Sequence, residues 1–205
     1  MAVHNITALL ILAPLAAFAA AGESLSWMSE PPVELRKGDL VFRRGRGFWT
    51  KYFVDVSTRE KRFSHVGVVW KVSKDKKNAL LIHADADDST GLGFVHKEMW
   101  KDFFERANSL ECAVFRWDGE DSGVPERLAE AVHKRIRVPF DPFFDMSETN
   151  KLYCTELIAE ALKEATATNF ISSTMYNGRE FIAIDDIYRI NFRRIYDSKD
   201  NSLRE

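Results

Sequence analysis

The sequence predicts an α+β domain, in which short apolar strands come before two amphipathic helices. The strand pattern is strongest at 63–72 (FSHVGVVWKV) and 79–84 (ALLIHA), two segments that the polar turn 73–78 separates. The helix pattern comes from 124–136 and 153–165, where apolar residues recur at helical spacing. A length of 205 residues accommodates one such domain with short extensions.

The composition narrows the class of protein. Lys and Arg together number 29 and Asp and Glu number 31, a balance that argues against a protein held to nucleic acid by charge. Because 45% of the residues are hydrophobic and 12% are aromatic, the chain is too apolar to be disordered. Two cysteines are too few for a disulfide-rich scaffold. We therefore expect a globular domain with a buried core.

The N-terminus is predicted to be an export signal, residues 1–21. Residues 6–21 (ITALLILAPLAAFAAA) carry no charge and end in small residues that fit an A-x-A cleavage site. Pro14 and the Ala-rich end argue against a permanent membrane anchor, although an uncleaved anchor is the alternative. Cleavage leaves roughly 180 residues with an unchanged formal charge, and the predicted location is the periplasm or the exterior.

The rest of the chain divides into a linker at 22–34, a domain at 35–197 and a flexible tail at 198–205. Further strands are predicted at 38–42, where a turn leads into the strand, and at 94–96, 112–117 and 191–196. Further helices are predicted at 97–107 and, after a turn, at 184–190. The segment 43–62 is predicted to be a basic and aromatic loop with room for a helical turn, and 140–150 is rich in turns. The basic loop could steer anionic substrates or lipid headgroups, but such a run is more often only a solvated surface.

Cys154 has the most distinctive position of any reactive side chain. It stands at the start of the predicted helix 153–165, where the helix dipole and free backbone N–H groups favour a thiolate. The same N–H groups could stabilise an oxyanion on an attacked carbonyl. Two other interpretations compete with this one. Cys154 can be a small core residue, or it can form a disulfide with Cys112 that would block the nucleophile.

A thiol nucleophile needs a base, and two histidines are candidates. If 63–72 and 79–84 form a hairpin centred near Lys74, His65 and His83 face each other, and a slip of two residues leaves them diagonal. His83 could then hold the tautomer of His65. The alternatives are a structural pair of histidines, or a metal site completed by Asp85 or Asp87. We rank the metal site lower, because a solvated turn is the ordinary explanation of the acidic loop.

Five short segments occur in order along the chain: GDLVF at 38–42, FSHVGV at 63–68, LIHA at 81–84, VPFD at 138–141 and LYCTEL at 152–157. Taken together, they resemble the YiiX/YebB-like proteins, which are circularly permuted relatives of NlpC-type papain-fold hydrolases. The resemblance implies a permuted papain-like fold, with an antiparallel sheet packed against the helix that bears the nucleophile. In the permuted order the histidine strand precedes the cysteine helix, as it does here.

The resemblance also implies roles for individual residues. Cys154 is the implied nucleophile, His65 the base and His83 the third polar residue, at a position where YiiX-like proteins commonly carry Glu. Tyr153 and Asp141 match family positions, with substrate binding as the predicted role and a structural turn as the alternative. Neither a metal nor another cofactor is predicted.

The predicted function is that of an exported thiol-dependent hydrolase, of the amidase or peptidase type. It is expected to cleave an amide, in a cell-wall peptide or a related small molecule, through an acyl-thioester intermediate. One alternative is a lipid or acyl ester hydrolase or acyltransferase, by analogy with the lecithin–retinol acyltransferase-like branch of the permuted group. The others are a non-catalytic binding module and a metallohydrolase. The expected partners are the substrate and the cell wall or a membrane surface, and not nucleic acid.

Overall fold

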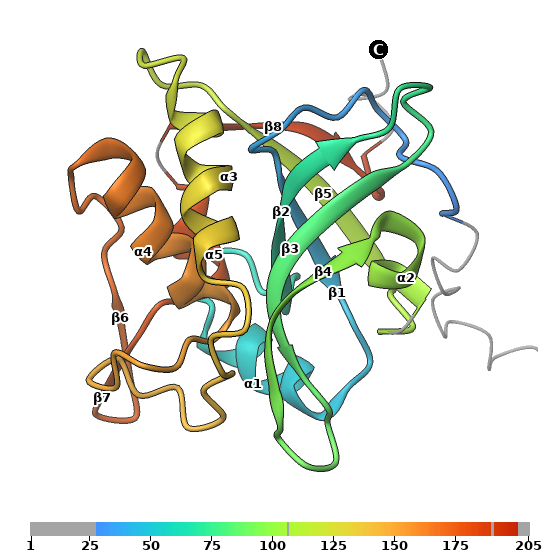
Figure 1. Ribbon diagram of the computed structural model, residues 1–205. Helices are drawn as coiled ribbons and strands as arrows, with labels where there is room; N and C mark the ends of the chain where they lie inside the picture. Colours follow the sequence, from blue (N-terminus) through green and yellow to red (C-terminus); the bar gives the residue numbers. More distant parts are fainter. Residues whose placement is uncertain (1–27, 106, 190, 201–205) are drawn as a thin grey trace, which may run out of the picture.

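A six-stranded antiparallel sheet forms the centre of the computed structural model, which describes residues 28–105, 107–189 and 191–200 (Figure 1). The strand order is β4-β3-β2-β1-β5-β8, and each pair of neighbours is antiparallel. The strands are β1 (Leu40–Arg44), β2 (His65–Val72), β3 (Ala79–Ala86), β4 (Gly93–Met99), β5 (Glu111–Trp117) and β8 (Phe192–Asp197). The predicted export signal at 1–21 lies outside the described residues.

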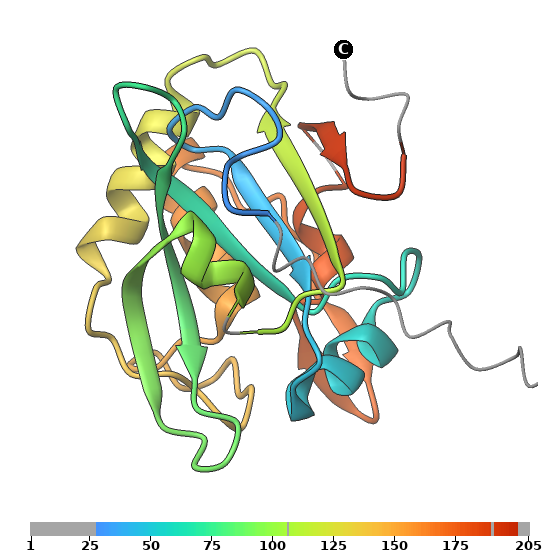
Figure 2. The same cartoon turned by 90° about the vertical axis from the view of Figure 1, so that its right-hand side faces the viewer.

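Helices cover both faces of this sheet (Figures 1 and 2). On one face lie α3 (Val124–Lys134), α4 (Cys154–Thr166) and α5 (Ile184–Ile187), and on the other lies α2 (Trp100–Glu105). A separate hydrophobic core fills each side, with Leu157 in the first and Phe103 in the second. The predicted α+β fold, with an antiparallel sheet packed against the helix that begins at Cys154, is confirmed.

Three elements differ from the prediction. The expected loop at 43–62 contains a helix, α1 (Phe48–Val56), whose Phe53 and Val56 are buried in the core. Strand β4 continues to Met99, so that the predicted helix 97–107 begins only at Trp100. A hairpin of β6 (Thr174–Tyr176) and β7 (Arg179–Phe181) was not predicted. Residues 97–99 form part of β4 because their pairing with β3 outweighs the helical spacing of apolar residues in the local sequence.

Both ends of the described chain pack against the sheet. Met28, within the predicted linker, is buried, and its carbonyl accepts a hydrogen bond of 3.1 Å from the indole of Trp100. At the other end, Ser198 exchanges hydrogen bonds of 2.9 and 3.0 Å with the backbone of Cys112. Among the residues that the structure describes, no helix has the length and apolar character needed to cross a membrane.

Candidate active site

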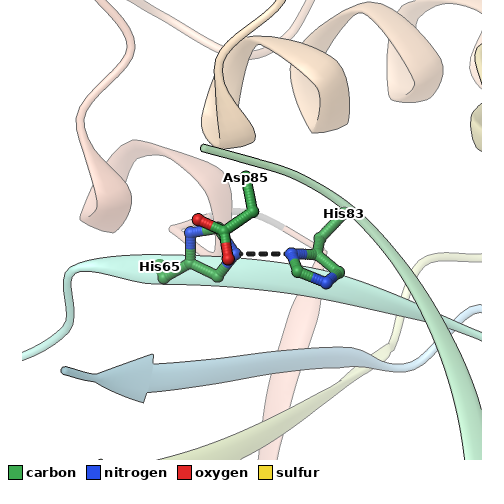
Figure 3. Close-up of side chains that lie close together, drawn as sticks. All are labelled: His65, His83 and Asp85. Carbon is green, nitrogen blue, oxygen red and sulfur yellow. Dashed lines mark hydrogen bonds between the residues drawn. The ribbon is translucent and has the colours of Figure 1, made fainter. Parts of the chain in front are cut away.

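Two buried histidines on adjacent strands form the centre of the site. The pairing of Val68 with Ile82 fixes the register of β2 against β3 and places His83 opposite Gly67, diagonal to His65. Nε2 of His65 lies 2.8 Å from Nδ1 of His83, at hydrogen-bond distance (Figure 3). The arrangement is diagonal because the hairpin turn lies farther along the chain than predicted. Burial lowers the pKa of both imidazoles, so that each is neutral at neutral pH.

A carboxylate stands behind this pair. Nε2 of His83 lies 3.0 Å from Oε2 of Glu98, and both side chains are buried. Glu98 belongs to β4 and lies opposite Leu81 of β3. The local sequence hides Glu98, because the spacing of apolar residues predicts a helix at 97–107 where β4 continues to Met99. Continuing the two-residue period of the strand from His96 would have placed Glu98 on the same face as His83.

Arg43 is a second residue whose position the sequence did not reveal. It was predicted to belong to a basic surface loop, but it lies buried in β1, opposite His65 of β2. Its Nη2 is 3.2 Å from Oδ2 of Asp85, its Nη1 donates to the carbonyl of Phe103, and its guanidinium lies 4.2 Å from the centre of the Phe103 ring. A buried cation therefore stands beside the histidine pair.

Cys154 is the first residue of α4 and is buried. Two effects on its thiol oppose each other. Burial raises the thiol pKa, whereas the backbone N–H groups of Val66 and Thr155 and the charge of Arg43 lower it. Burial is the larger effect and raises the pKa of Cys154 to about 12. The helix start favours the thiolate, as the sequence predicts, but burial outweighs it, and a pKa of about 12 leaves the thiol protonated at neutral pH.

Cys154 and His65 line one cavity of about 370 Å³. Its wall is mixed in character and comes from the β1–α1 segment, the end of β3, Phe140 and the start of α4. Asp85 and Arg43 contribute charge, and Trp49 and Phe53 contribute aromatic surface. The cavity thus brings together a thiol, an imidazole and a helix N-terminus, the groups needed for attack on a carbonyl.

Tyr153 and Thr155, the residues on either side of Cys154, hold the start of α4 in place. The hydroxyl of Tyr153 accepts a hydrogen bond of 3.0 Å from the backbone N–H of Ile182, and Thr155 donates one of 2.6 Å to the carbonyl of the same residue. The ring of Tyr153 stacks on Phe181, with centroids 5.1 Å apart. Tyr153 is fully buried and is not among the residues that line the cavity.

Asp141 is also buried and is also absent from the cavity lining. Its carboxylate accepts hydrogen bonds from the backbone N–H groups of Phe143 and Asp145, which is the pattern of an acid that stabilises a turn. The turn lies between Phe140 and Leu152, which form a β-bridge shortly before α4 begins.

The two cysteines are both free and lie in different cores. Cys112 packs with the residues on the α2 side of the sheet, and Cys154 packs on the α4 side. A bond between them would have to pass through the sheet. The disulfide alternative is therefore contradicted, and the sulfur of Cys154 stays available for chemistry.

The metal alternative meets an electrostatic obstacle. Ligand atoms of His65, His83 and Asp85 lie within 4.8 Å of one another. However, the facing imidazole nitrogens already bond to each other, and Asp85 already pairs with the buried guanidinium of Arg43. A divalent cation at this point would stand beside a buried positive charge. As arranged, these residues do not fit a metal centre.

Comparison with known proteins agrees with the fold. Residues 34–181 match the model of a family described as permuted papain-like amidase enzymes, YaeF/YiiX, C92 family. Among solved structures, the chain resembles the metalloprotein YiiX from Escherichia coli O157:H7, with a TM-score of 0.62 and 14% sequence identity over 81% of this chain and 99% of that one. No curated protein sequence matches significantly.

The family model covers the sheet from β1 to β5, the histidine pair and the helix that carries Cys154, and the solved structure shares the overall fold. The chain has a permuted papain-like fold and belongs to the permuted papain-like amidase family, YaeF/YiiX, C92.

Proposed function

We propose that the protein is an exported cysteine amidase, with Cys154 as the nucleophile, His65 as the general base and His83 as the residue that orients His65. The observation that carries this proposal is the cavity that both Cys154 and His65 line, together with the contact of 2.8 Å between Nε2 of His65 and Nδ1 of His83. Membership of an amidase family supports an amide as the substrate.

The proposed reaction has two stages. The ring nitrogen of His65 that faces away from His83 accepts the thiol proton while Sγ attacks the amide carbonyl carbon. Backbone N–H groups at the start of α4 stabilise the oxyanion. The C–N bond then breaks, His65 gives its proton to the amine, and an acyl-thioester remains. In the second stage His65 takes a proton from water, which attacks the thioester, releasing a carboxylic acid and restoring the thiol.

The protonation states of the resting site support proton transfer during the attack. The thiol of Cys154 has a pKa of about 12, and the pKa of His65 is held well below its ordinary value by burial and by Arg43. Both shifts disfavour a thiolate–imidazolium pair before substrate binds, so the proton has to move from sulfur to the imidazole while the carbon–sulfur bond forms. This arrangement resembles a general-base mechanism more than a permanent thiolate–imidazolium pair.

For the substrate we propose a small amide or a cell-wall peptide. The cavity wall combines Arg43 and three aspartates with aromatic rings, a mixture that suits a polar molecule carrying some apolar groups. The cavity volume of about 370 Å³ suits a fragment of a few residues. Acyl transfer to another acceptor, or ester cleavage, would use the same thioester. The export signal at 1–21 is the basis for the proposed periplasmic or extracellular location.

Acyl-enzyme capture tests the proposal. The protein is incubated with p-nitrophenyl acetate and with a panel of N-acyl aminocoumarin amides, and the adduct is mapped by mass spectrometry. We expect an acyl group on Cys154 that His65→Ala greatly slows. Cys112→Ala, which removes the other buried thiol, should acylate normally. Acylation of Cys112 instead, or amide cleavage that survives Cys154→Ala and is lost to a chelator, would refute the proposal.

A further inference from the structure

Glu98 is a buried carboxylate for which the proposed reaction has so far no use. It lies in β4 with 4% of its surface exposed. Burial of a carboxylate costs several kcal/mol or more unless partners compensate its charge. Elsewhere in the same sheet, buried acids pair with arginines: Glu111 lies 2.8 Å from Arg62, and Asp39 lies 2.7 Å from Arg116. Glu98 instead approaches an imidazole, 3.0 Å from Nε2 of His83.

That contact bears on where the protons lie along this chain of side chains. An ionised carboxylate only accepts hydrogen bonds, so a carboxylate oxygen 3.0 Å from Nε2 of His83 favours the tautomer in which Nε2 carries the proton. In a neutral imidazole the other nitrogen, Nδ1, is then an acceptor. Because Nδ1 of His83 lies 2.8 Å from Nε2 of His65, the proton in that bond belongs to His65. The remaining nitrogen of His65, Nδ1, is left unprotonated and points away from His83 (Figure 3).

We propose that Glu98 is a positioning residue that acts through His83 to fix the tautomer in which Nδ1 of His65 is the catalytic base. The inference rests on the proposed function. Glu98 does not touch the substrate. The negative charge of Glu98 also stabilises the positive charge that His65 and His83 share after His65 has accepted the thiol proton. A neutral His83 alone could not provide this stabilisation.

Substitutions at position 98 separate the effect of the carboxylate charge from the effect of the side-chain shape. Glu98→Gln keeps the shape and removes the charge, and its amide can donate to His83 as well as accept. We expect it to lower kcat for the amide used above by about 10- to 100-fold with little change in KM. Glu98→Asp keeps the charge and should recover part of the rate. Glu111→Gln is the matched control, since it removes a buried carboxylate from the same sheet at a distance from the histidines, and it should leave kcat unchanged.

A spectroscopic measurement tests the inference without a substrate. In ¹⁵N-labelled protein at neutral pH, long-range ¹H–¹⁵N correlations distinguish the two tautomers of each imidazole. We expect His65 and His83 each to be protonated at Nε2 alone. Glu98→Gln should produce a mixture of tautomers, whereas Glu111→Gln should not.

The two readouts separate the possible failures. If the wild-type tautomers are as expected but no thioester forms on any acyl donor, the proposed function fails and the tautomer assignment stands. If the protein is an active amidase but His65 is protonated at Nδ1, or Glu98→Gln keeps full kcat, the inference is overturned. It is also overturned if the purified protein holds a stoichiometric metal that Glu98→Gln releases, since Glu98, His83 and His96 would then act as ligands.

Discussion

At the scale of single residues, the reactivity of Cys154 depends on a competition that the sequence does not display. The helix start is visible in the sequence, and it does lower the thiol pKa through the N–H of Thr155. The depth of burial depends on how the sheet and α4 pack together, and it raises the pKa by more. The position of Cys154 at the start of a helix could thus be predicted, but the resting charge of its sulfur could not.

Alkylation across pH tests this resting state. Because the thiol pKa is raised to about 12, we expect reaction of Cys154 with iodoacetamide to accelerate only above the ordinary thiol pKa of about 8.5. Peptide mapping identifies the alkylated cysteine, and Cys154→Ala provides the blank. A plateau of rapid alkylation at pH 6 to 7, roughly two units below that of a free thiol, would show that a thiolate exists before substrate binds.

Tyr153 gives a second test at this scale. Tyr153→Phe leaves the backbone N–H of Ile182 without its hydroxyl acceptor, so we expect a loss of about 1–2 kcal/mol in the free energy of unfolding. Since Tyr153 does not line the cavity, KM should stay within about twofold of the wild-type value. Urea unfolding and steady-state kinetics measure the two effects. A large rise in KM with unchanged stability would support the substrate-binding role that the sequence predicted.

At the scale of elements, the site depends on the register of three adjacent strands. The hairpin of β2 and β3 could be predicted because both strands have clear apolar patterns and one polar turn joins them. The contribution of β4 could not, because local spacing at Trp100 and Phe103 favours a helix and hides the strand that carries Glu98. The pairing of β4 with β3 stabilises a strand at these residues instead of a helix, and a single sequence does not reveal that long-range pairing.

Gly67 of β2 packs closely against both His83 of β3 and Phe103 of α2. An added Cβ would lie 3.3 Å from Cε2 of Phe103 and 3.4 Å from Cβ of His83. Gly67→Ala should therefore displace one of these rings, destabilise the protein by about 1–2 kcal/mol and lower kcat by an order of magnitude or more. Thermal unfolding and acylation rates measure both effects. A variant with wild-type kinetics would show that the histidine pair tolerates movement of its neighbours.

At the scale of the whole molecule, a network of charges ties the last strand to the first half of the chain. Asp197 of β8 accepts two hydrogen bonds of 2.8 Å from Arg62, which precedes β2, and one of 2.7 Å from Arg194. These bonds outweigh the cost of burial and lower the pKa of Asp197 to about 2. The sequence does not reveal the pairing of Arg62 with Asp197, since the two residues are 135 positions apart.

The network predicts how stability depends on acid. A carboxyl with a lowered pKa stabilises the fold above its unfolded value of 3.8, and this contribution is lost as pH falls towards 2. At neutral pH we expect Asp197→Asn to lower the free energy of unfolding by about 2 kcal/mol. The difference from wild type should shrink as the pH falls from about 4 to about 2, the range between the unfolded and the folded pKa of Asp197. Asp121→Asn, at an exposed ion pair, is the control and should have no measurable effect. A constant difference across this pH range would contradict the assignment.

The sheet that separates Cys112 from Cys154 affects how the protein would respond to an oxidising compartment outside the cytoplasm. Oxidants there commonly inactivate thiol enzymes by joining neighbouring sulfurs into a cross-link. In this molecule the backbone itself stands in the way of that reaction. An exported form of the protein would accordingly be protected from this one route of inactivation.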